Sequence, residues 1–310
     1  MMTRTAQEQQ AYERFRAIAG DFVIPKQMIR NNSDDYRRQV FEEGVRPNQL
    51  WVARHEGYAA YVAIVSVGAD ERTVVAMPMD GDLDVQTRDS LIMLHDTPLG
   101  LPMVAWPALT TEIPVRLLAK PAGEFAESDM RIFVSGHPDG IRVQQGASPR
   151  FSMDEAIYDE MVAHIRRWHD MCAELPQLEP QKASAGVSLD RVAAMKELMR
   201  KMGMSLEDAA AVVDRTTPAT DKQRRTLAGI GISLDDIPAR TSTLPKDLLI
   251  EVEQPRWRAE ADQYAARMEG DARLNLAQSA FALAARRTGH GRESWRGALM
   301  QAADGDTGRK

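Results

Sequence analysis

The spacing of apolar residues changes twice along the chain. Residues 5–19 and 33–44 carry apolar residues three or four positions apart, which is the spacing of an amphipathic helix. The second of these ranges begins at Ser33, a good N-cap, and ends at Gly44. In residues 50–119 the pattern becomes short apolar runs rich in β-branched and aromatic residues, among them LWVAR, YVAIVSVG, RTVVAMP and IPVRLLA. Several short strands without long helices between them favour a small antiparallel barrel or sandwich.

A further pair of strands is predicted just beyond this region. The segments MRIFVSG and GIRVQQG flank the sequence His137-Pro138-Asp139-Gly140. Proline presets a φ angle suited to a turn, and glycine accepts a positive φ. The pattern therefore predicts a β-hairpin that turns at these four residues.

From residue 152 to residue 175 the helical period returns. Apolar residues recur three or four positions apart and form one continuous stripe, which packs one face of a helix against a core. The stripe consists of Ile157, Met161, Ile165, Trp168, Cys172 and Leu175.

The most linker-like segment is PQLEPQKASAG, residues 176–186, which has two prolines and no apolar period. Every segment beyond it has a helical pattern, and the polar residues 304–310 form a tail that we expect to be disordered. The sequence thus predicts an α+β protein with a β-barrel domain over residues 1–175 and an all-helical domain over residues 187–303.

Composition narrows the class of protein. Of the 310 residues, 44% are hydrophobic and 27% are charged, which is typical of soluble globular chains. No apolar stretch approaches the ~20 residues of a membrane helix, and the N-terminus has no apolar core after its positive charge, so neither a membrane anchor nor a secretory signal is expected. The single cysteine, Cys172, excludes an internal disulfide framework and suits the reducing cytoplasm.

Charge is distributed unevenly between the two halves of the chain. Residues 1–180 contain 18 Lys and Arg against 27 Asp and Glu, and residues 181–310 contain 21 against 18. The basic residues of the second half are mostly arginines, which bind phosphate in a bidentate manner. This mild excess of positive charge permits nucleic-acid binding in the second half without requiring it.

Two groups of residues invite a metal site. The alternating carboxylates of Asp80, Asp82 and Asp84 could bind a divalent cation, but no partner glutamate follows at loop spacing. A second group includes His164 and His169, but residues five apart do not share a helical face. We therefore expect the aspartates to form a solvated acidic loop and the second group to occupy core or surface positions on a helix. We expect neither a metal nor a cofactor. The second group consists of His164, His169, Asp170 and Cys172.

The sequence contains no recognisable motif for a nuclease, for a hydrolase or for a phosphate-binding loop. Pro138-Asp139 lacks the acid and lysine that a metal-dependent nuclease would carry on the following strand, since IRVQQ offers only Arg142. Ser135 and Ser188 lie in no recognisable hydrolase motif, and there is no glycine-rich phosphate loop. We therefore predict no catalytic residue.

The segment SLEDAAAVVDRTTPATDKQRRTLAGIG, residues 205–231, gives the clearest functional signal. It predicts a short helix, a four-residue turn and a second helix opened by Pro218, which is the layout of a helix-turn-helix. The exposed side of the second helix could offer amide and guanidinium groups to phosphates and base edges. A helical hairpin of purely structural type is the alternative. The candidate nucleic-acid-binding residues are Lys222, Gln223, Arg224 and Arg225.

The order of motifs in residues 47–125 resembles the MazF/PemK family of bacterial toxins, whose SH3-like barrels cleave RNA, and the related CcdB toxins. The matching pieces are PNQLWVAR, YVAIVSV, RTVVAMPMDGD and LGLPMVAWPALTTEIPVRLLAKPAGEF. The resemblance implies an SH3-like barrel. The family's arginine at the start of the second strand is replaced by Ala59-Ala60, and its threonine or serine after the proline of the third strand is replaced by Met79-Asp80. The resemblance therefore implies a barrel without the family's catalytic groups.

These observations favour a bacterial cytoplasmic nucleic-acid-binding or regulatory protein in a toxin–antitoxin or phage-defence setting. Its helical domain would contact DNA or RNA, and its degenerate barrel would bind a protein partner. One alternative is an endoribonuclease that uses other residues, such as Arg54, Asp80 and Arg88. Another is a protein-interaction or assembly component without enzyme activity. The sequence leaves open whether the chain forms a homo-oligomer.

Overall fold

The computed structural model describes most of the chain, with gaps at both ends and in several connections. It divides the chain into two compact units, Met1–Ala173 and Glu174–Lys310. The helix predicted over residues 5–19, most of the predicted linker and most of the polar tail lie outside the described residues. The described residues are 24–147, 152–178, 189–213, 217, 219–234, 244–266, 270–284 and 291–305.

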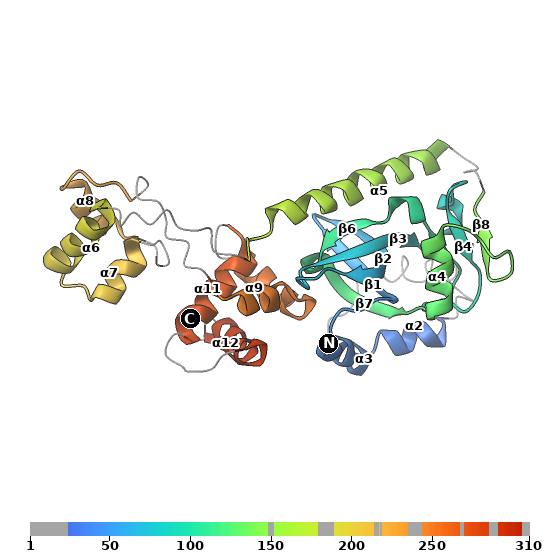
Figure 1. Cartoon of the computed structure of the whole chain (residues 1–310), viewed down its shortest axis with the longest axis horizontal. Coiled ribbons are helices and arrows are strands. Elements are labelled where there is room, and N and C mark those ends of the chain that lie inside the picture. Colours follow the sequence, from blue (N-terminus) through green and yellow to red (C-terminus); the bar gives the residue numbers. More distant parts are fainter. Residues whose placement is uncertain are drawn as a thin grey trace, which may run out of the picture. The chain divides into compact units, whose positions relative to one another are not determined.

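The first unit is built on one antiparallel sheet of eight strands, in the order β7-β1-β2-β3-β5-β4-β8, with β6 paired to β3 (Figure 1). The short apolar runs of the sequence supply its central strands, as predicted. The strands are β1 (Gln49–His55), β2 (Tyr58–Val67), β3 (Thr73–Asp80), β4 (Leu91–Met93), β5 (Met103–Ala105), β6 (Thr111–Pro114), β7 (Leu118–Glu124) and β8 (Val143–Gln145).

Both faces of this sheet are covered, because successive side chains of a strand point to opposite sides. In β2, Val62 and Ile64 enter one core, whereas Ala63 between them enters the other. The helix α5 (Ser152–Asp170) packs Ile165 and Trp168 into the first of these cores. The helix α5 is followed by the 3₁₀ helix η4 (Met171–Glu174).

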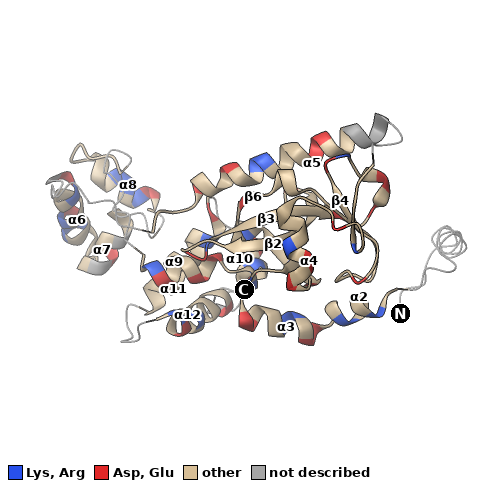
Figure 2. Cartoon of the chain, turned by 45° about the vertical axis from the view of Figure 1, so that its right-hand side comes forward, with Lys and Arg blue, Asp and Glu red and all other residues tan. Residues whose placement is uncertain are grey.

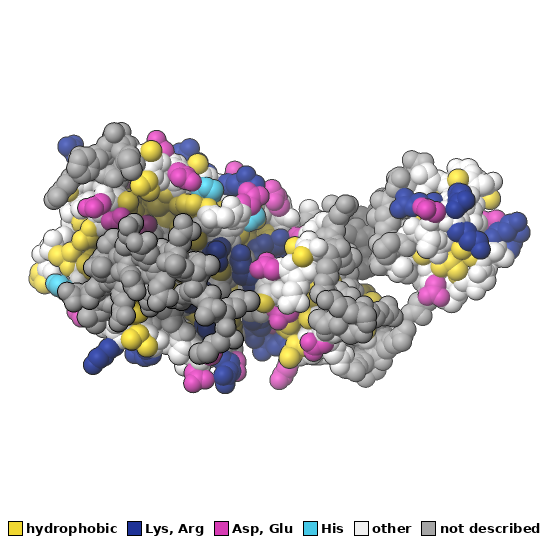
Figure 3. Space-filling view, turned by 180° about the vertical axis from the view of Figure 1, so that it is seen from behind, with side chains coloured by type: hydrophobic (Ala, Val, Ile, Leu, Met, Phe, Trp, Pro, Cys, Tyr) yellow, Lys and Arg dark blue, Asp and Glu magenta, His cyan; other side chains and the backbone are white. Residues whose placement is uncertain are grey.

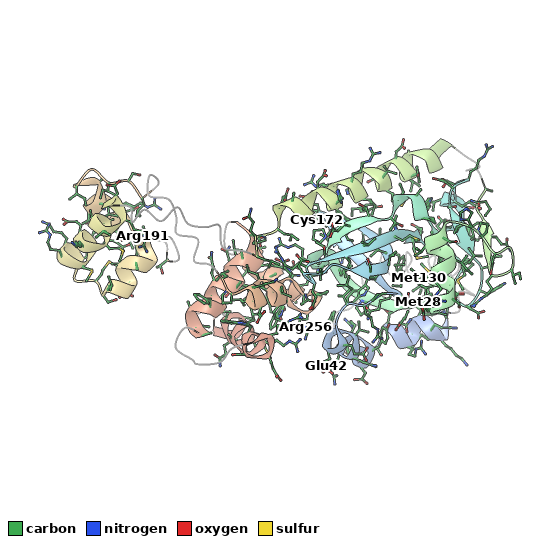
Figure 4. All side chains as sticks on the ribbon, in the orientation of Figure 1. Met28, Glu42, Met130, Cys172, Arg191 and Arg256 are labelled. Atoms are coloured by element: carbon green, nitrogen blue, oxygen red, sulfur yellow. The ribbon has the colours of Figure 1, made fainter. Side chains whose placement is uncertain are left out.

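The opposite face is covered by α4 (Glu127–Ser135) and by α2 (Lys26–Asn31). Met130 of α4 is buried in the second core and Met28 of α2 packs against the same core, so the two labelled side chains lie close together in Figure 4. The helix α3 (Asp34–Glu43) follows α2, and its N-cap is Ser33, whose side chain accepts a hydrogen bond from the N–H of Tyr36. The N-cap prediction is therefore confirmed.

The predicted hairpin around residue 138 is wrong. Its first arm is the helix α4, because Met130 and Phe133 lie three positions apart on one buried face and Gly136 ends the helix in a left-handed conformation. Its second arm is β8, which pairs with β4 rather than with its neighbour in sequence. The turn itself forms, since Asp139 Oδ1 accepts three backbone N–H groups, from residues 141, 142 and 143.

The segment IPVRLLA, predicted as a single strand, instead spans a corner. It contains the end of β6, the 3₁₀ helix η3 (Val115–Leu117) and the start of β7. The corner lets β6 pair with β3 and β7 pair with β1. Two further 3₁₀ helices, η1 (Leu83–Val85) and η2 (Pro107–Leu109), connect neighbouring strands. The strand order leaves β7 and β8 at its two ends, so the closed barrel stays a prediction.

In the apolar stripe predicted for residues 152–175, Met161, Ile165 and Trp168 are buried, as expected. Ile157, however, is 47% exposed. No helix among the described residues is long and apolar enough to cross a membrane.

The described part of the second unit is helical, as predicted, and contains two separate cores. One core is formed by the first three helices and includes Leu198, Val212 and Leu227; the other is formed by the last four helices and includes Leu248 and Leu276. The sequence pattern did not reveal α9. The helices are α6 (Leu189–Met202), α7 (Leu206–Val213), α8 (Asp221–Ala228), α9 (Lys246–Glu253), α10 (Arg258–Ala265), α11 (Ala272–Ala284) and α12 (Arg292–Gly305), with the 3₁₀ helix η5 (Pro255–Trp257) before α10.

Candidate nucleic-acid interface

The helix α8 carries all four candidate nucleic-acid-binding residues, and its start is fixed by a capping box. Thr220 Oγ1 accepts the N–H of Gln223 at 3.3 Å, and Gln223 Oε1 accepts the N–H of Thr220 at 2.7 Å. The helix therefore begins at Asp221, after the predicted start at Pro218. The sequence signal for this start was present, because a threonine followed three residues later by glutamine is a capping-box pattern.

The capping box changes the role of Gln223. Its side chain is buried, and its Nε2 lies 3.4 Å from the sulfur of Met204. An amide held in this way cannot reach a base edge without breaking the cap. Gln223 therefore lies on the side of α8 that faces the apolar core of the three helices, and its contact with nucleic acid stays an untested prediction.

The other three candidates, Lys222, Arg224 and Arg225, are exposed on α8. Arg224 Nε donates to the carbonyl oxygen of Ala219 at 3.5 Å, and Arg225 Nε donates to that of Asp221 at 3.2 Å. Both hydrogen bonds are local and solvent-exposed. The guanidinium groups therefore stay at the surface, where they can exchange these carbonyl oxygens for phosphate oxygens at small cost.

A second basic element, the end of α6, lies against α8. Thr226 Oγ1 is 4.0 Å from the sulfur of Met202, the last residue of α6. Arg200 and Lys201 precede Met202 and are exposed, so the end of the helix that contacts α8 also carries positive charge. Basic positions mark both α6 and α8 in Figure 2, and one face of this part of the molecule shows several Lys and Arg side chains in Figure 3. We call Arg200, Lys201, Lys222, Arg224 and Arg225 the basic surface.

Not all of this charge is equally available. Arg200 forms a bidentate ion pair with Glu197, with distances of 2.7 and 3.0 Å from Nη2 to Oε1 and from Nε to Oε2. The acid partly neutralises Arg200 and holds its side chain along α6. Lys222, Arg224 and Arg225 therefore carry most of the surface's capacity to attract a phosphate.

Most of the connection between α7 and α8 lies outside the described residues. Within the described part of the chain, α7 extends to Val213 and α8 begins at Asp221, so the four-residue turn stays a prediction. The start of α7 behaves as expected, because Ser205 Oγ accepts the N–H of Asp208 at 3.0 Å. The two helices share one core with α6, and the helix-turn-helix layout stays a prediction.

The acidic loop that follows β3 is held by its own backbone. Asp80 Oδ1 accepts the N–H of Asp82 at 2.8 Å, and Asp82 Oδ1 accepts the N–H of Asp84 at 2.9 Å. Burial raises the pKa of Asp80, and the nearby negative charge of Asp82 raises it further, although the backbone N–H groups oppose this. Among the described residues, no three His, Cys, Asp or Glu side chains are arranged to hold a metal ion.

A group of ionisable side chains gathers where α5 crosses the sheet. The rings of Tyr58 and His164 are stacked, with centroids 4.0 Å apart and planes 4° apart, and His164 Nε2 lies 3.7 Å from Glu160 Oε1. Burial, with the charges of Asp80 and Glu160, raises the pKa of Tyr58 to about 12. No sequence pattern indicates Tyr58, because only the packing of α5 against β2 brings it beside His164.

His169 and Cys172, farther along the chain than His164, make contacts of different kinds. His169 Nδ1 lies 3.2 Å from Thr111 Oγ1 and 3.1 Å from the carbonyl oxygen of Glu112, which fastens α5 to β6. Cys172 is half-buried in η4, and burial, together with the nearby acids Glu112 and Asp70, raises the pKa of its thiol to about 11.

The three residues considered for an alternative ribonuclease do not converge. Arg54 of β1 pairs with Ala59, and both lie on the face of the sheet that carries Ala63 and Met79. Asp80 follows Met79 and therefore points to the opposite face. Arg88 is exposed in the segment between η1 and β4.

The densest group of charges in the described part of the second unit was not recognised in the sequence. Glu251 of α9 is fully buried, and three arginines contact its carboxylate: Arg256, Arg292 and Arg296. Trp257 Nε1 donates to Glu251 Oε1 at 3.2 Å. No sequence motif predicts this group, because its members come from three elements that tertiary packing brings together.

Compared with models of known protein families, with curated proteins and with solved structures, the chain shows no significant match. The resemblance to the MazF/PemK family therefore stays an expectation carried by short motifs in residues 47–125.

Proposed function

We propose that this protein binds nucleic acid through the basic surface. The observation that carries the proposal is that Lys222, Arg224 and Arg225 are all exposed on one capped helix, and that Lys201 near the end of α6 is exposed as well. Positive side chains on a fixed helix attract the phosphate backbone, and this attraction does not depend on base sequence. Because Gln223 is part of the cap, the surface contacts phosphates rather than reading bases.

Fluorescence anisotropy of the full chain with a labelled 20-base-pair DNA, at several salt concentrations, tests the proposal. The triple variant Lys222→Ala, Arg224→Ala, Arg225→Ala should bind more weakly, and the slope of log affinity against log salt should fall by about 3 if each side chain neutralises one phosphate. A single-stranded RNA of equal length shows which nucleic acid is preferred.

A matched control removes the same charge elsewhere. Arg38 and Arg131 are exposed in the first unit and Arg37 is partly exposed, and each is ion-paired with an acid on its own helix. Their triple replacement by alanine should leave both the affinity and the salt slope unchanged. Equal affinities and slopes for the α8 variant and the natural chain would remove the basic surface as the binding site.

A second candidate, RNA cleavage in the first unit, is favoured by one observation: the grouping of Tyr58, His164 and Asp80. An aspartate of raised pKa and a histidine could share the roles of general acid and base. A ribonuclease assay on a labelled single-stranded RNA should then show cleavage that Asp80→Asn and His164→Ala both abolish. Uncleaved RNA with the natural chain would count against this activity.

A further inference from the structure

Two methionine sulfurs at the end of α6 contact one face of α8. Met204 Sδ lies 3.4 Å from Gln223 Nε2, and Met202 Sδ lies 4.0 Å from Thr226 Oγ1. Thr226 Oγ1 already donates to the carbonyl oxygen of Lys222 at 2.8 Å, so its contact with Met202 is one of packing. The sulfur of Met204, in contrast, accepts a hydrogen bond. We call Met202 and Met204 the methionine contact.

The hydrogen bond to Met204 supports the cap of α8. The Oε1 atom of Gln223 accepts the N–H of Thr220 at 2.7 Å, and the Nε2 atom of the same amide donates to the sulfur of Met204. The oxygen of the amide therefore caps the helix while its nitrogen rests on the thioether. A chemical change at this sulfur would move the amide and loosen the start of the helix that carries the basic surface.

The methionine contact can be reached from solvent. Met202 and Met204 are partly exposed, and Met199, three residues before Met202 on α6, is 36% exposed. Met93 and Met103, in the second core of the first unit, are 0% exposed. Because an oxidant dissolved in water reaches a thioether through its exposed surface, the methionines at the end of α6 should oxidise before those of that core.

Oxidation by a peroxide adds one oxygen atom to a methionine sulfur. A lone pair of the sulfur attacks one oxygen of hydrogen peroxide, the S–O bond forms as the O–O bond breaks, and the departing hydroxide takes the proton of the transferred oxygen to become water. The sulfur loses two electrons, which the peroxide gains. The resulting sulfoxide is polar and chiral, so it disrupts apolar packing, and methionine sulfoxide reductases reverse the change.

We propose that Met202 and Met204 form a site of reversible methionine oxidation that weakens nucleic-acid binding by loosening α8. A peroxide oxidises the methionine contact, the amide of Gln223 loses its thioether partner, and α8 holds the basic surface less firmly. The effect on binding rests on the proposed function. The effect on the local stability of α8 does not, so the two can fail separately.

Treatment of the full chain with hydrogen peroxide, followed by three measurements, tests the site. Peptide mass spectrometry should show one added oxygen atom on each of Met202 and Met204. Amide hydrogen exchange of residues 221–228 should become several-fold faster, because the helix opens more often. Fluorescence anisotropy should show a several-fold loss of affinity for DNA. A mixture of methionine sulfoxide reductases, one for each sulfoxide epimer, should restore both the exchange rate and the affinity.

The double variant Met202→Leu, Met204→Leu keeps apolar side chains of similar volume but lacks the reactive sulfurs. Peroxide should change neither its hydrogen exchange in α8 nor its affinity for DNA. Met300→Leu is the matched control: it removes a methionine of α12 that is 59% exposed, and this variant should respond to peroxide as the natural chain does. Met204→Gln places a polar group where the sulfoxide would lie, so it should imitate oxidation without peroxide. It also serves if the double variant fails to fold.

Three results would overturn the proposal. One is unchanged hydrogen exchange in α8 after complete oxidation of Met202 and Met204. Another is that both residues stay unoxidised while Met300 is oxidised. The third is an equal loss of affinity in the natural chain and the double leucine variant, which would assign the sensitivity to another methionine. If the natural chain binds no nucleic acid, the proposed function fails, and the hydrogen exchange of α8 alone then decides whether oxidation of the methionine contact loosens the helix.

Discussion

Thr220 and Gln223 satisfy each other's backbone at the start of α8: each side chain accepts the other residue's N–H, at 3.3 and 2.7 Å. This relationship fixes where the helix begins and turns Gln223 away from solvent. Lys222 and Arg224, on either side of Gln223 in the sequence, are exposed as a result. The same three-residue spacing that caps the helix therefore also selects which of its polar side chains can reach a ligand.

Replacing Gln223 by alanine should destabilise the second unit by about 1 kcal/mol, because the N–H of Thr220 loses its partner. Urea unfolding followed by circular dichroism would measure the change. Gln223→Glu is the matched control, since glutamate forms the same capping box and should keep most of the stability. An alanine variant as stable as the natural chain, yet defective in DNA binding, would restore Gln223 as a contact residue.

Replacing Arg142 by alanine should cost about 3 kcal/mol in the free energy of unfolding of the first unit. Arg142 forms a bidentate pair with Asp129, with distances of 2.8 and 3.1 Å, and Asp129 is 1% exposed. Without the guanidinium, a buried carboxylate loses its cation. Urea denaturation measures the cost.

The control for this variant is Arg131, which lies on α4, the helix that carries Asp129. Arg131 pairs with Glu127, but both side chains are more than two-thirds exposed, so Arg131→Ala should change the free energy of unfolding by less than about 0.5 kcal/mol. Similar losses for the Arg131 and Arg142 variants would show that burial of Asp129 does not govern the energy of its ion pair.

Tyr58 should make the stability of the first unit decrease between about pH 10 and pH 12. Burial raises its pKa from 10.0 to about 12 in the folded protein. Below pH 10 the phenol is protonated in both states, so its contribution is constant. Above pH 10 the unfolded chain releases this proton and the folded chain keeps it until about pH 12, which favours unfolding as the pH rises.

An alkaline titration followed by phenolate absorbance tests this prediction. The difference between the natural chain and Tyr58→Phe should show one phenol that ionises near pH 12 in the folded protein and near pH 10 in urea. A folded-state difference centred near pH 10 would contradict the raised pKa.

Cys172 should react slowly with iodoacetamide at pH 8. The thiolate is the reactive form, and a pKa raised from 9.0 to about 11 lowers its population about a hundredfold. The alkylation rate of the folded chain should keep increasing up to about pH 11, whereas the rate in urea should level off near pH 9. Because Cys172 is the chain's single cysteine, its labelling is unambiguous. A folded-state alkylation rate that levels off near pH 9 would contradict the prediction that burial lowers the thiolate population of Cys172.

Local features of the sequence predicted much of the secondary structure. The β-branched runs became β1, β2 and β3, Ser33 caps α3, and helices are the regular elements of the described chain beyond the linker. Each of these rests on interactions between residues a few positions apart, such as strand propensity, capping and the helical period. The candidate basic helix was found for the same reason, because Lys222, Arg224 and Arg225 are neighbours in the sequence.

The predictions that differ from the structure have a common physical cause. Contacts with residues distant in the sequence decide the secondary structure of a segment and the exposure of its side chains. MRIFVSG is apolar enough for a strand, but the core that receives Met130 and Phe133 makes it a helix, while the segment after it pairs with β4. Gln223 appeared free to read bases until its packing against Met204 placed it inside.

The sequence by itself determined the α+β class, the helical second half and the position of the exposed basic residues, because short-range patterns encode them. Only the tertiary structure decided which side chains meet. Glu251 and Arg296 lie 45 residues apart in the sequence, and Tyr58 and His164 lie farther apart still. Desolvation and ion pairing depend on distance in space, so no reading of the chain alone could assemble these two groups.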